Sequence, residues 1–476
     1  MVTETRLSSE QLYCSCEPEL LPFKTTSTLE PFTGFFGQER AIEAMGFGIG
    51  MRRPGYNLFV MGNPHTGRFS FAMENLKSVA KKEKKPGDWV YLNNLSDSRH
   101  PLAITFPPGK AQPFKRDIKH IIESTLTEMP AAFESPTYQR RKSKIERDLN
   151  RYYDQAIEGV EKEAREHSIA VYRDAGSIGF TPVADGQAMD EAVFSQLPED
   201  VRDAFTKAIS DLEDKLNEAL TGLPKWRREA AEKMKNLDRD TARQSISPLF
   251  QPLRDKYANI SAATDYLVEM ETSLVKNCAD IVGEDKLLEP LTDASRRSYM
   301  EGEYGVNLLV DNQKIKGAPV IYEGHPSYEN LFGRVEYTSE MGALSTSYKL
   351  IRPGALHQAN GGYLVLEAEK LLEQPFVYGA LKRALKSNQI RIESPASEYT
   401  GISTITLLPE AVPLSVKVVL IGARNIYYLL QELDHDFEKM FRVVVDFDED
   451  VKRTPQSIRS YARLMKTLAE EEGLAP

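Results

Sequence analysis

A charge-rich stretch from about residue 135 to about residue 290 interrupts a sequence that otherwise has the pattern of an α/β domain. On both sides of this stretch, glycine, proline and short apolar runs alternate. Within it, apolar residues recur at steps of three and four, which is the spacing of one face of a helix. This order predicts an α/β core, with a parallel sheet and flanking helices, that is interrupted by a long, coiled-coil-like helical insertion.

Two apolar series predict the long helices of the insertion, over residues 145–160 and 201–223. Their spacing builds a narrow apolar seam, as in a coiled coil or a long helical hairpin. A third helical stretch, at about 226–278, is expected to break near Pro248, because proline removes a helical hydrogen bond.

The segment between the two series predicts a tip loop or a small hairpin. Gly176, Gly179 and Pro182 break the helical pattern there. Phe180 would then lie exposed at the tip, and we interpret it as a contact for protein substrates. The alternative is that Phe180 belongs to the core of the helical bundle.

A phosphate-binding turn is indicated at residues 62–70. An apolar strand at 57–61 runs into the turn, and a helical pattern follows. Its two glycines have the G-x-x-x-x-G spacing of a P-loop, in which backbone N–H groups hold phosphate oxygens. We therefore assign ATP binding to the residues of this turn, namely Gly62, His65, Thr66, Gly67, Arg68, Phe69 and Ser70.

The turn departs from the P-loop motif at two positions. Arg68 replaces the usual lysine but keeps its positive charge. Phe69 replaces the serine or threonine whose hydroxyl helps to hold Mg²⁺, and a phenyl ring cannot bind a metal. Ser70 follows one residue late, about 100° further around a helix. Weak ATP binding or slow hydrolysis is therefore expected.

The second half of the predicted site follows about 300 residues later. An apolar strand at 363–366 ends in Glu367, as in a Walker-B motif, where a buried strand delivers a carboxylate to Mg²⁺. We therefore assign Glu367 to the metal and to catalysis. Ala368 stands where a general base would follow, and it cannot accept a proton. The alternative is that Glu367 is a solvated strand end.

Two more polar residues are candidates for catalysis. Asn425 follows an apolar strand at 417–421, where a polar group can orient the attacking water. Arg442 precedes the strand that begins at Val443, and we interpret it as an arginine that acts on the nucleotide of a neighbouring subunit. The alternatives are a capping residue for Asn425 and a surface position for Arg442.

A substrate-gripping pore loop is predicted between Gly324 and Gly333. Tyr328 and Phe332 lie in this segment, and an aromatic ring near a flexible glycine suits a loop that pulls on an unfolded chain. The alternative is that both rings are packed in the core.

Several stretches, in order along the chain, resemble Lon-like AAA+ proteases of the subgroup with a large insertion between Walker A and Walker B. Phe-Gly-Gln-Glu-Arg-Ala at 36–41 resembles the box that precedes the P-loop in AAA+ ATPases. Gly-Ala-Leu-His-Gln-Ala-Asn-Gly-Gly at 354–362 resembles the run into Walker B. Further similar stretches lie at 133–135, 304–312, 333–336, 381–385 and 446–448.

The resemblance implies an AAA+ fold, a hexameric ring, ATP with Mg²⁺, and unfolded or damaged proteins as substrates. It also implies a Ser–Lys protease dyad in a C-terminal domain, for which we find no matching turn here. The expected function is thus the ATP-binding unfoldase segment of a Lon-like serine protease. The alternative is a nucleotide-insensitive ring scaffold whose insertion recruits or gates protein substrates.

The expected domains follow from these positions. They are an N-terminal segment at 1–33, the first core part with the P-loop at 34–133, the helical insertion at 134–295, the second core part at 296–450, and the start of a helical lid at 451–476.

Composition narrows the remaining possibilities. A net charge of −10 argues against a third hypothesis, an AAA+ machine that binds nucleic acid through a basic face. Three unevenly spaced cysteines, Cys14, Cys16 and Cys278, make no disulfide framework. The sequence shows neither a signal peptide nor a membrane-spanning stretch, so a cytoplasmic protein without a membrane partner is expected.

Overall fold

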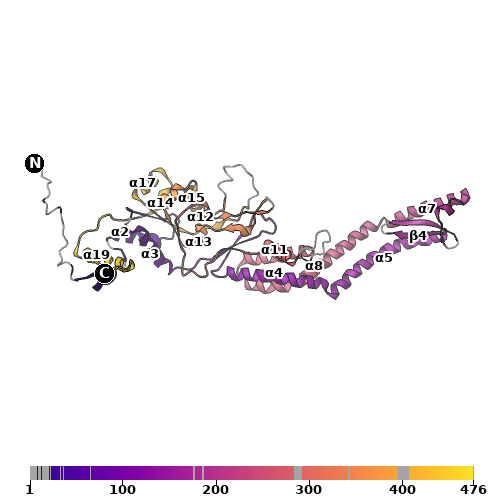
Figure 1. Ribbon diagram of the computed structural model, residues 1–476, viewed down its shortest axis with the longest axis horizontal. Coiled ribbons are helices and arrows are strands. Elements are labelled where there is room, and N and C mark those ends of the chain that lie inside the picture. Colours follow the sequence, from indigo (N-terminus) through magenta and orange to yellow (C-terminus); the bar gives the residue numbers. More distant parts are fainter. Residues whose placement is uncertain are drawn as a thin grey trace. The chain divides into compact units, whose positions relative to one another are not determined.

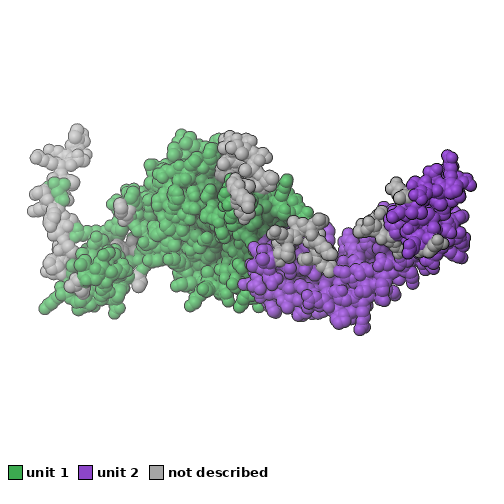
Figure 2. Space-filling view, turned by 45° about the vertical axis from the view of Figure 1, so that its right-hand side comes forward, with its two compact units in different colours: residues 1–116, 305–476 green, residues 117–304 purple. Residues whose placement is uncertain are grey.

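The computed structural model describes residues 8, 12, 21, 23–32, 34–35, 37–64, 66–174, 177–184, 187–282, 292–340, 343–393 and 407–474. The chain forms two compact units (Figure 2). The core unit contains residues 1–116 and 305–476, and the insertion unit contains residues 117–304. The insertion predicted at 134–295 lies within the second unit. His65 and Gly176 lie outside the described residues.

A five-stranded parallel sheet forms the centre of the core unit. Its strand order is β17-β1-β16-β13-β8, and each pair of neighbours runs parallel. The predicted fold class is confirmed, since this parallel sheet with flanking helices is interrupted by a helical unit. The strands are β1 (Leu58–Met61), β8 (Val320–Glu323), β13 (Tyr363–Glu367), β16 (Lys417–Gly422) and β17 (Val443–Asp446).

Helices cover both faces of this sheet, which explains why its central strands are apolar on both sides. Along β1, Leu58 and Val60 pack with α2 (Glu39–Gly50) and α3 (Arg68–Ala80) on one face. Phe59 belongs to the cluster on the other face. The helices of that face include α14 (Ala368–Glu373), α15 (Val377–Ser387), α17 (Arg424–Leu433) and α18 (Phe437–Met440). The first three of these lie together in Figure 1.

Shorter elements complete the core unit. The helical ones are η2 (Thr26–Thr28), α12 (Tyr328–Phe332), η3 (Tyr348–Leu350), α13 (Ala355–Gln358) and α19 (Pro455–Glu471). The paired strands are β9 (Arg334–Val335) with β12 (Ile351–Arg352), β10 (Thr338–Glu340) with β11 (Ala343–Ser345), and β14 (Gln389–Ile390) with β15 (Val412–Pro413).

The helix α19 occupies most of the stretch expected to begin a lid. Thr454 caps it, because its hydroxyl accepts a hydrogen bond from Ser457 N. The ammonium of Lys466 donates to the backbone oxygens of Ser27 and Leu29, at 3.1 and 2.5 Å. These bonds hold α19 against the segment that precedes α2.

The insertion unit is built mainly from helices. They are α5 (Pro136–Glu166), α6 (Glu191–Phe194), α7 (Glu199–Leu220), α8 (Leu223–Lys256), α9 (Ser261–Lys276), α10 (Cys278–Val282) and α11 (Asp293–Tyr304). The helix α4 (Ala111–Glu134) begins in the core unit and continues into this one. The first apolar series falls on α5, and the second falls on α7 except for its last residue, Leu223, which begins α8. Ile157 and Val160 of α5 pack with Leu212 of α7.

The predicted break at Pro248 is wrong. α8 continues through both Pro248 and Pro252 to Lys256, and the chain turns only before α9. Each proline removes one backbone hydrogen bond, but Ile246 and Phe250 on the same helix are completely buried. Burial of these side chains compensates for the lost bonds and keeps the helix intact.

A three-stranded sheet, β4 (Ile169–Asp174), β5 (Ser177–Ala184) and β6 (Gln187–Ala188), lies at the ends of α5 and α7 (Figure 1). It corresponds to the hairpin predicted for this segment. Across the ranges that the structure describes, no helix is both long enough and apolar enough to cross a membrane.

A second sheet in the core unit has the order β3-β2-β7 and contains β2 (Asp88–Leu92), β3 (Leu102–Phe106) and β7 (Asn307–Val310). Asp88 is fully buried and joins this sheet to its surroundings. Its carboxylate accepts hydrogen bonds from Ala111 N, the first residue of α4, at 3.1 Å and from Asn312 N at 2.9 Å. One side chain thus links segments that the insertion separates in sequence.

We expect Asp88→Ala to lower the free energy of unfolding by about 2–5 kcal/mol, because it leaves two buried N–H groups without acceptors. Urea unfolding followed by circular dichroism measures the change. Asp88→Asn keeps one acceptor oxygen and should lose about half as much. A loss below about 0.5 kcal/mol for the alanine variant would contradict the linking role.

Candidate nucleotide site

The carboxyl ends of three neighbouring strands bring the two predicted halves of the site together. In the sheet register, Met61 of β1 lies beside Gly422 of β16, and Ile421 lies beside Glu367 of β13. Strands are spaced by about 4.8 Å, so the turn after β1 and Glu367 are roughly 10 Å apart across β16. Open parallel sheets bind ligands at this edge.

Glycine is required at each of two positions in the turn, for different structural reasons. Gly67 has a left-handed backbone, with φ of 78°, and caps α3, whose Phe71 N donates to Gly67 O at 2.9 Å. A Cβ atom at Gly62 would lie 2.8 Å from Phe447 Cβ, so close packing requires a glycine there. Thr66 Oγ1 donates to Asn63 O at 2.9 Å within the turn.

Arg68 uses its side chain inside the protein. Its Nη1 donates to Gly62 O at the end of β1 and to Gly422 O, at 2.5 Å, at the end of β16. The guanidinium therefore lies in the crevice between the turn and the neighbouring strand. It places a positive charge there and joins two backbone segments.

Phe69 packs against β8, the strand next to the one that carries Glu367. Its ring lies 4.8 Å from the ring of Tyr322 in an edge-on arrangement. The hydroxyl of Tyr322 donates to Glu367 Oε1, and Lys370 Nζ donates to the same oxygen at 2.9 Å. The Tyr322 hydroxyl and the Lys370 ammonium thus bond to the same oxygen of the Glu367 carboxylate, and Phe69 packs against Tyr322.

The protonation of Glu367 reflects these neighbours. Partial burial raises the pKa of Glu367, but hydrogen bonds from Tyr322 and Lys370, with the charges of Lys370 and Arg68, outweigh burial and hold that pKa below its usual value. In return, the hydrogen bond to Glu367 raises the pKa of Lys370. The pair is therefore ionised at neutral pH.

These residues do not fit Mg²⁺. The position of the usual hydroxyl is the phenyl ring of Phe69, and one Glu367 oxygen already accepts two donors. Lys370 and Arg68 add positive charge where a divalent cation would need negative charge. Within the described ranges, no group of three or more His, Cys, Asp or Glu residues could hold a metal.

The residue that follows Glu367 is an alanine, which cannot act as a general base. Ala368 is completely buried. A Cβ atom added at Gly422 would lie 3.0 Å from the Cβ of Ala368. Glu369, the next carboxylate, accepts a hydrogen bond from Ala423 N at 2.7 Å. The Glu369 carboxylate is thus engaged in a hydrogen bond with Ala423, the residue that precedes α17.

An ion-pair cluster that the sequence reasoning missed lies beside this edge, at the end of β17. Arg424 donates to Asp446 at 2.8 Å and pairs with Glu449, and Arg40 reaches Asp446 at 3.3 Å and Asp448 at 3.0 Å. Two sequence signals point to it, namely the position of Arg424 directly before Asn425 and the Asp-Phe-Asp stretch at 446–448.

Asn425 itself is exposed in the first turn of α17. The structure gives it no hydrogen-bond partner among the described residues, so its role as a water-orienting group stays a prediction.

Arg442 lies at the amino ends of the strands, on the side of the sheet away from the turn at 62–70. It precedes β17, and its guanidinium stands 5.3 Å from the ring centre of Tyr56. A residue at the amino end of β17 is remote from the turn after β1 in the same chain. Action on a neighbouring subunit, as predicted, stays a proposal.

The pore-loop prediction is wrong at Phe332. This ring is 3% exposed and belongs to the core cluster, and Tyr328 packs against it with ring centres 4.7 Å apart. Both residues lie in the short helix α12, which Ser327 caps. A ring that fills the core cannot grip a passing chain, so the alternative of core packing holds.

Phe180 of the tip sheet is half-buried. It lies opposite Val171 and packs against the cluster between α5 and α7, so most of its ring faces inward. Tyr172, on the other face of this sheet, is 55% exposed and was not singled out in the sequence.

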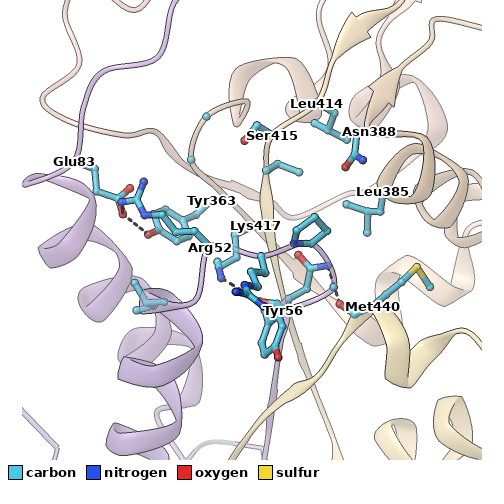
Figure 3. Close-up of a pocket in the computed structure, with 18 residues that line it drawn as sticks. Arg52, Tyr56, Glu83, Tyr363, Leu385, Asn388, Leu414, Ser415, Lys417 and Met440 are labelled. Atoms are coloured by element: carbon cyan, nitrogen blue, oxygen red, sulfur yellow. Dashed lines mark hydrogen bonds and ion pairs between the residues drawn. The ribbon is translucent and has the colours of Figure 1, made fainter.

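A pocket of about 220 Å³ opens at the amino ends of the strands, away from the nucleotide site (Figure 3). At its floor, Lys417 Nζ donates to three backbone oxygens, which belong to Gly48, Met51 and Tyr56. Burial and the charge of Arg52 lower the pKa of Lys417 to about 8. This lysine closes the end of α2, and lysine commonly binds the last carbonyls of a helix in this way.

Comparison with known proteins adds family information. A family model described as LonB-like, AAA domain matches residues 316–448, from just before β8 to just after β17. A second, described as Lon-like LonC helical domain, matches residues 88–121, from β2 into α4. Neither range includes the turn at 62–70.

A Lon protease homolog of Escherichia coli (strain K12) is 30% identical over 89 residues, which cover 19% of this chain and 14% of that protein. The match thus spans a small part of that relative. Among solved structures, NtrX from Brucella abortus is 20% identical, covers 33% of each chain and has a TM-score of 0.21. A likeness that low carries no argument.

We expect Glu367→Gln to lower the stability at neutral pH by less than about 1 kcal/mol, because the Lys370 pair is partly solvated. Since the folded-state pKa of Glu367 is lowered, its stabilisation is present above the unfolded pKa of about 4.3 and is lost as pH falls through the folded value. Urea midpoints over a pH series measure this. A stability difference between Glu367→Gln and the unmodified chain that is the same at all pH values would contradict this prediction.

Proposed function

We propose, from the premise that this chain is a Lon-like AAA+ protein, that it supplies a ring scaffold whose nucleotide site does not support Mg²⁺-dependent hydrolysis. The observation that carries this proposal is the engagement of Glu367. Its carboxylate accepts from Tyr322 and Lys370, and the phenyl ring of Phe69 packs against the ring of Tyr322. An AAA domain normally presents a hydroxyl and a free carboxylate to Mg²⁺ at these two places.

The charges at the site support the same proposal. In phosphoryl transfer, Mg²⁺ neutralises the charge that develops on the phosphates. Here Lys370 and Arg68 already supply two positive charges near Glu367. A hydrolytic step would also need a base, and Ala368 cannot provide one. Loss of a positioned base alone commonly slows a reaction about 10²–10⁴-fold.

The insertion unit would then supply the interaction with protein substrates. We propose that the full protein forms a hexameric ring, that unfolded or damaged proteins are its substrates, and that a proteolytic domain outside this chain cleaves them. The family matches support the Lon-like part of this proposal. The role of the insertion rests on its length and its distal sheet.

A second candidate is the ATP-binding unfoldase, and one observation favours it. The turn keeps its left-handed Gly67 and the start of α3, which is the backbone arrangement that holds phosphate. Together with Arg68 and Lys370, this turn could bind ATP without a metal. Binding of ATP in the presence of EDTA would support metal-free ATP binding. Hydrolysis of ATP would support a motor function.

A thermal shift measurement with millimolar ATP, with and without Mg²⁺, tests the first proposal. A ligand present at 100 times its Kd adds about 2.7 kcal/mol to the stability of the folded state. We expect no Mg²⁺-dependent rise in Tm and no steady ATP turnover by the purified chain. Turnover at tens per second, near typical enzyme values, would overturn the proposal.

We expect the triple variant Arg68→Lys, Phe69→Thr, Lys370→Ala to gain Mg²⁺-dependent binding of a fluorescent ATP analogue. The change restores the motif lysine, adds a hydroxyl ligand and removes the Lys370 ammonium from Glu367. The matched control carries Phe69→Val, because valine has the shape of threonine without its hydroxyl. Equal Mg²⁺ dependence in both triple variants would show that the hydroxyl at residue 69 is not what the site lacks.

A further inference from the structure

The pocket at the amino ends of the strands is large enough to hold a small molecule (Figure 3). Its volume is about 220 Å³. A cavity of roughly 150 Å³ in another protein binds benzene, so this pocket has room for one aromatic ring with a charged group. Residues of the core unit alone line it. The turn at 62–70 lies at the carboxyl ends of the same strands, so the pocket is separate from the nucleotide site.

The charged side chains that line this pocket do not balance one another. They are Arg52, Arg53, Glu83 and Lys417. Arg52 pairs with Glu83 at 2.7 Å, so these two charges cancel. Arg53 and Lys417 remain, and the lining therefore carries two net positive charges.

The ammonium of Lys417 keeps its charge there without a carboxylate within ion-pair distance in the part of the chain that the structure describes. It donates to three backbone oxygens around the end of α2, all of which are neutral. Burial and the charge of Arg52 lower the pKa of Lys417 to about 8, while Glu83 opposes this decrease. A buried charge is normally balanced by a partner of opposite charge, and a bound anion would supply one.

Polar groups with unused hydrogen-bonding capacity also line the pocket. They belong to Arg53, Asn388 and Ser415, whose side chains are exposed. Within the described ranges, the structure gives no hydrogen bond or ion pair to these three side chains. A guanidinium can bind a phosphate or a carboxylate through two parallel hydrogen bonds, and an amide and a hydroxyl can add further donors.

Apolar side chains complete the lining. Leu385 and Val416 are half-buried, and Met440 is 6% exposed. Ligand pockets commonly combine such an apolar wall with a few polar groups that fix the orientation of the ligand. The lining therefore suits a molecule that has an apolar body and a charged end.

We propose that this pocket binds a small organic dianion, either a phosphate monoester or a dicarboxylate, whose two charges Arg53 and Lys417 balance. Arg53 donates to the anion directly. Lys417 acts through its charge, because its three N–H groups already bond to backbone oxygens. The apolar body of the ligand packs against Leu385 and Val416. The site lies apart from the nucleotide site and does not depend on the proposed function.

Isothermal titration calorimetry of the 476-residue chain with phenyl phosphate tests this proposal. Arg53→Gln removes one of the two charges, and the structure gives no contact of that guanidinium on which folding would depend. We expect it to weaken binding about tenfold or more, because a charge-assisted hydrogen bond is lost. The matched control is Arg140→Gln, which makes the same change at an exposed position of the insertion unit and should bind as the unmodified chain does. An equal affinity of Arg53→Gln and the unmodified chain overturns the proposal.

The pH dependence of binding tests Lys417 without a substitution at this residue. The charged and titratable groups around its ammonium are Arg52, Arg53, Tyr56, Glu83 and Tyr363. Arginine, glutamate and tyrosine ordinarily titrate outside the range of about pH 7 to 9. A phosphate monoester has its second pKa at about 6, so phenyl phosphate stays a dianion over this range.

Lys417 alone of these groups loses its charge in that range, as pH rises through about 8. The anion favours the protonated form of Lys417, so we expect the affinity to fall about threefold to tenfold between roughly pH 7 and 9. The same affinity at both pH values would contradict the part assigned to Lys417.

Other ligands identify the class of anion. Phthalate carries two carboxylates on one ring, and benzoate carries one. Tighter binding of phenyl phosphate than of phthalate supports phosphate monoesters, and the reverse supports dicarboxylates. If benzoate binds as tightly as both dianions, or if neither dianion binds at millimolar concentrations, the proposal is wrong.

Arg68→Gln separates this pocket from the turn after β1, where a phosphate could also bind. Loss of phenyl phosphate binding with Arg68→Gln but not with Arg53→Gln would place the ligand at the turn and overturn the proposal. The proposed function fails on different evidence. Rapid ATP turnover with intact dianion binding refutes only the scaffold, whereas absent dianion binding in a chain that ignores nucleotide refutes only the pocket.

Discussion

The position of β16 between β1 and β13 is the constraint on which the rest of the core unit depends. Parallel pairing in register places Met61, Gly422 and Glu367 at one edge of the sheet. Parallel strands need long connections, and the connection between β1 and β13 contains the whole insertion unit. A long insertion is tolerated because the entropy cost of closing a loop grows only slowly with its length.

At that edge, the side chains satisfy one another. Arg68 bonds to backbone oxygens of two strands, and Glu367 bonds to Tyr322 and Lys370. The fold therefore keeps the backbone framework of a nucleotide site while its polar groups are used internally. The hydrogen bonds of these side chains are therefore satisfied within the fold, without a ligand.

The insertion unit depends on a different kind of interaction. Its helices are held by apolar seams, such as that of Ile157 and Leu212, and these need only the correct periodicity. Prolines inside α8 are tolerated for the same reason, since buried side chains around Pro248 outweigh one missing bond. At its far end, this seam supports a small three-stranded sheet.

The sequence by itself determined the order of the elements, the insertion, and the two defects at Phe69 and Ala368, because periodicity, glycine spacing and side-chain chemistry are local properties. It located Gly62 and Glu367 as two halves of one site through motif order. Only the tertiary structure decided what those residues contact. The burial of Phe332, the lysine beside Glu367 and the cluster around Arg424 depend on segments brought together by sheet pairing and packing, and spacing along one chain carries no record of such partners.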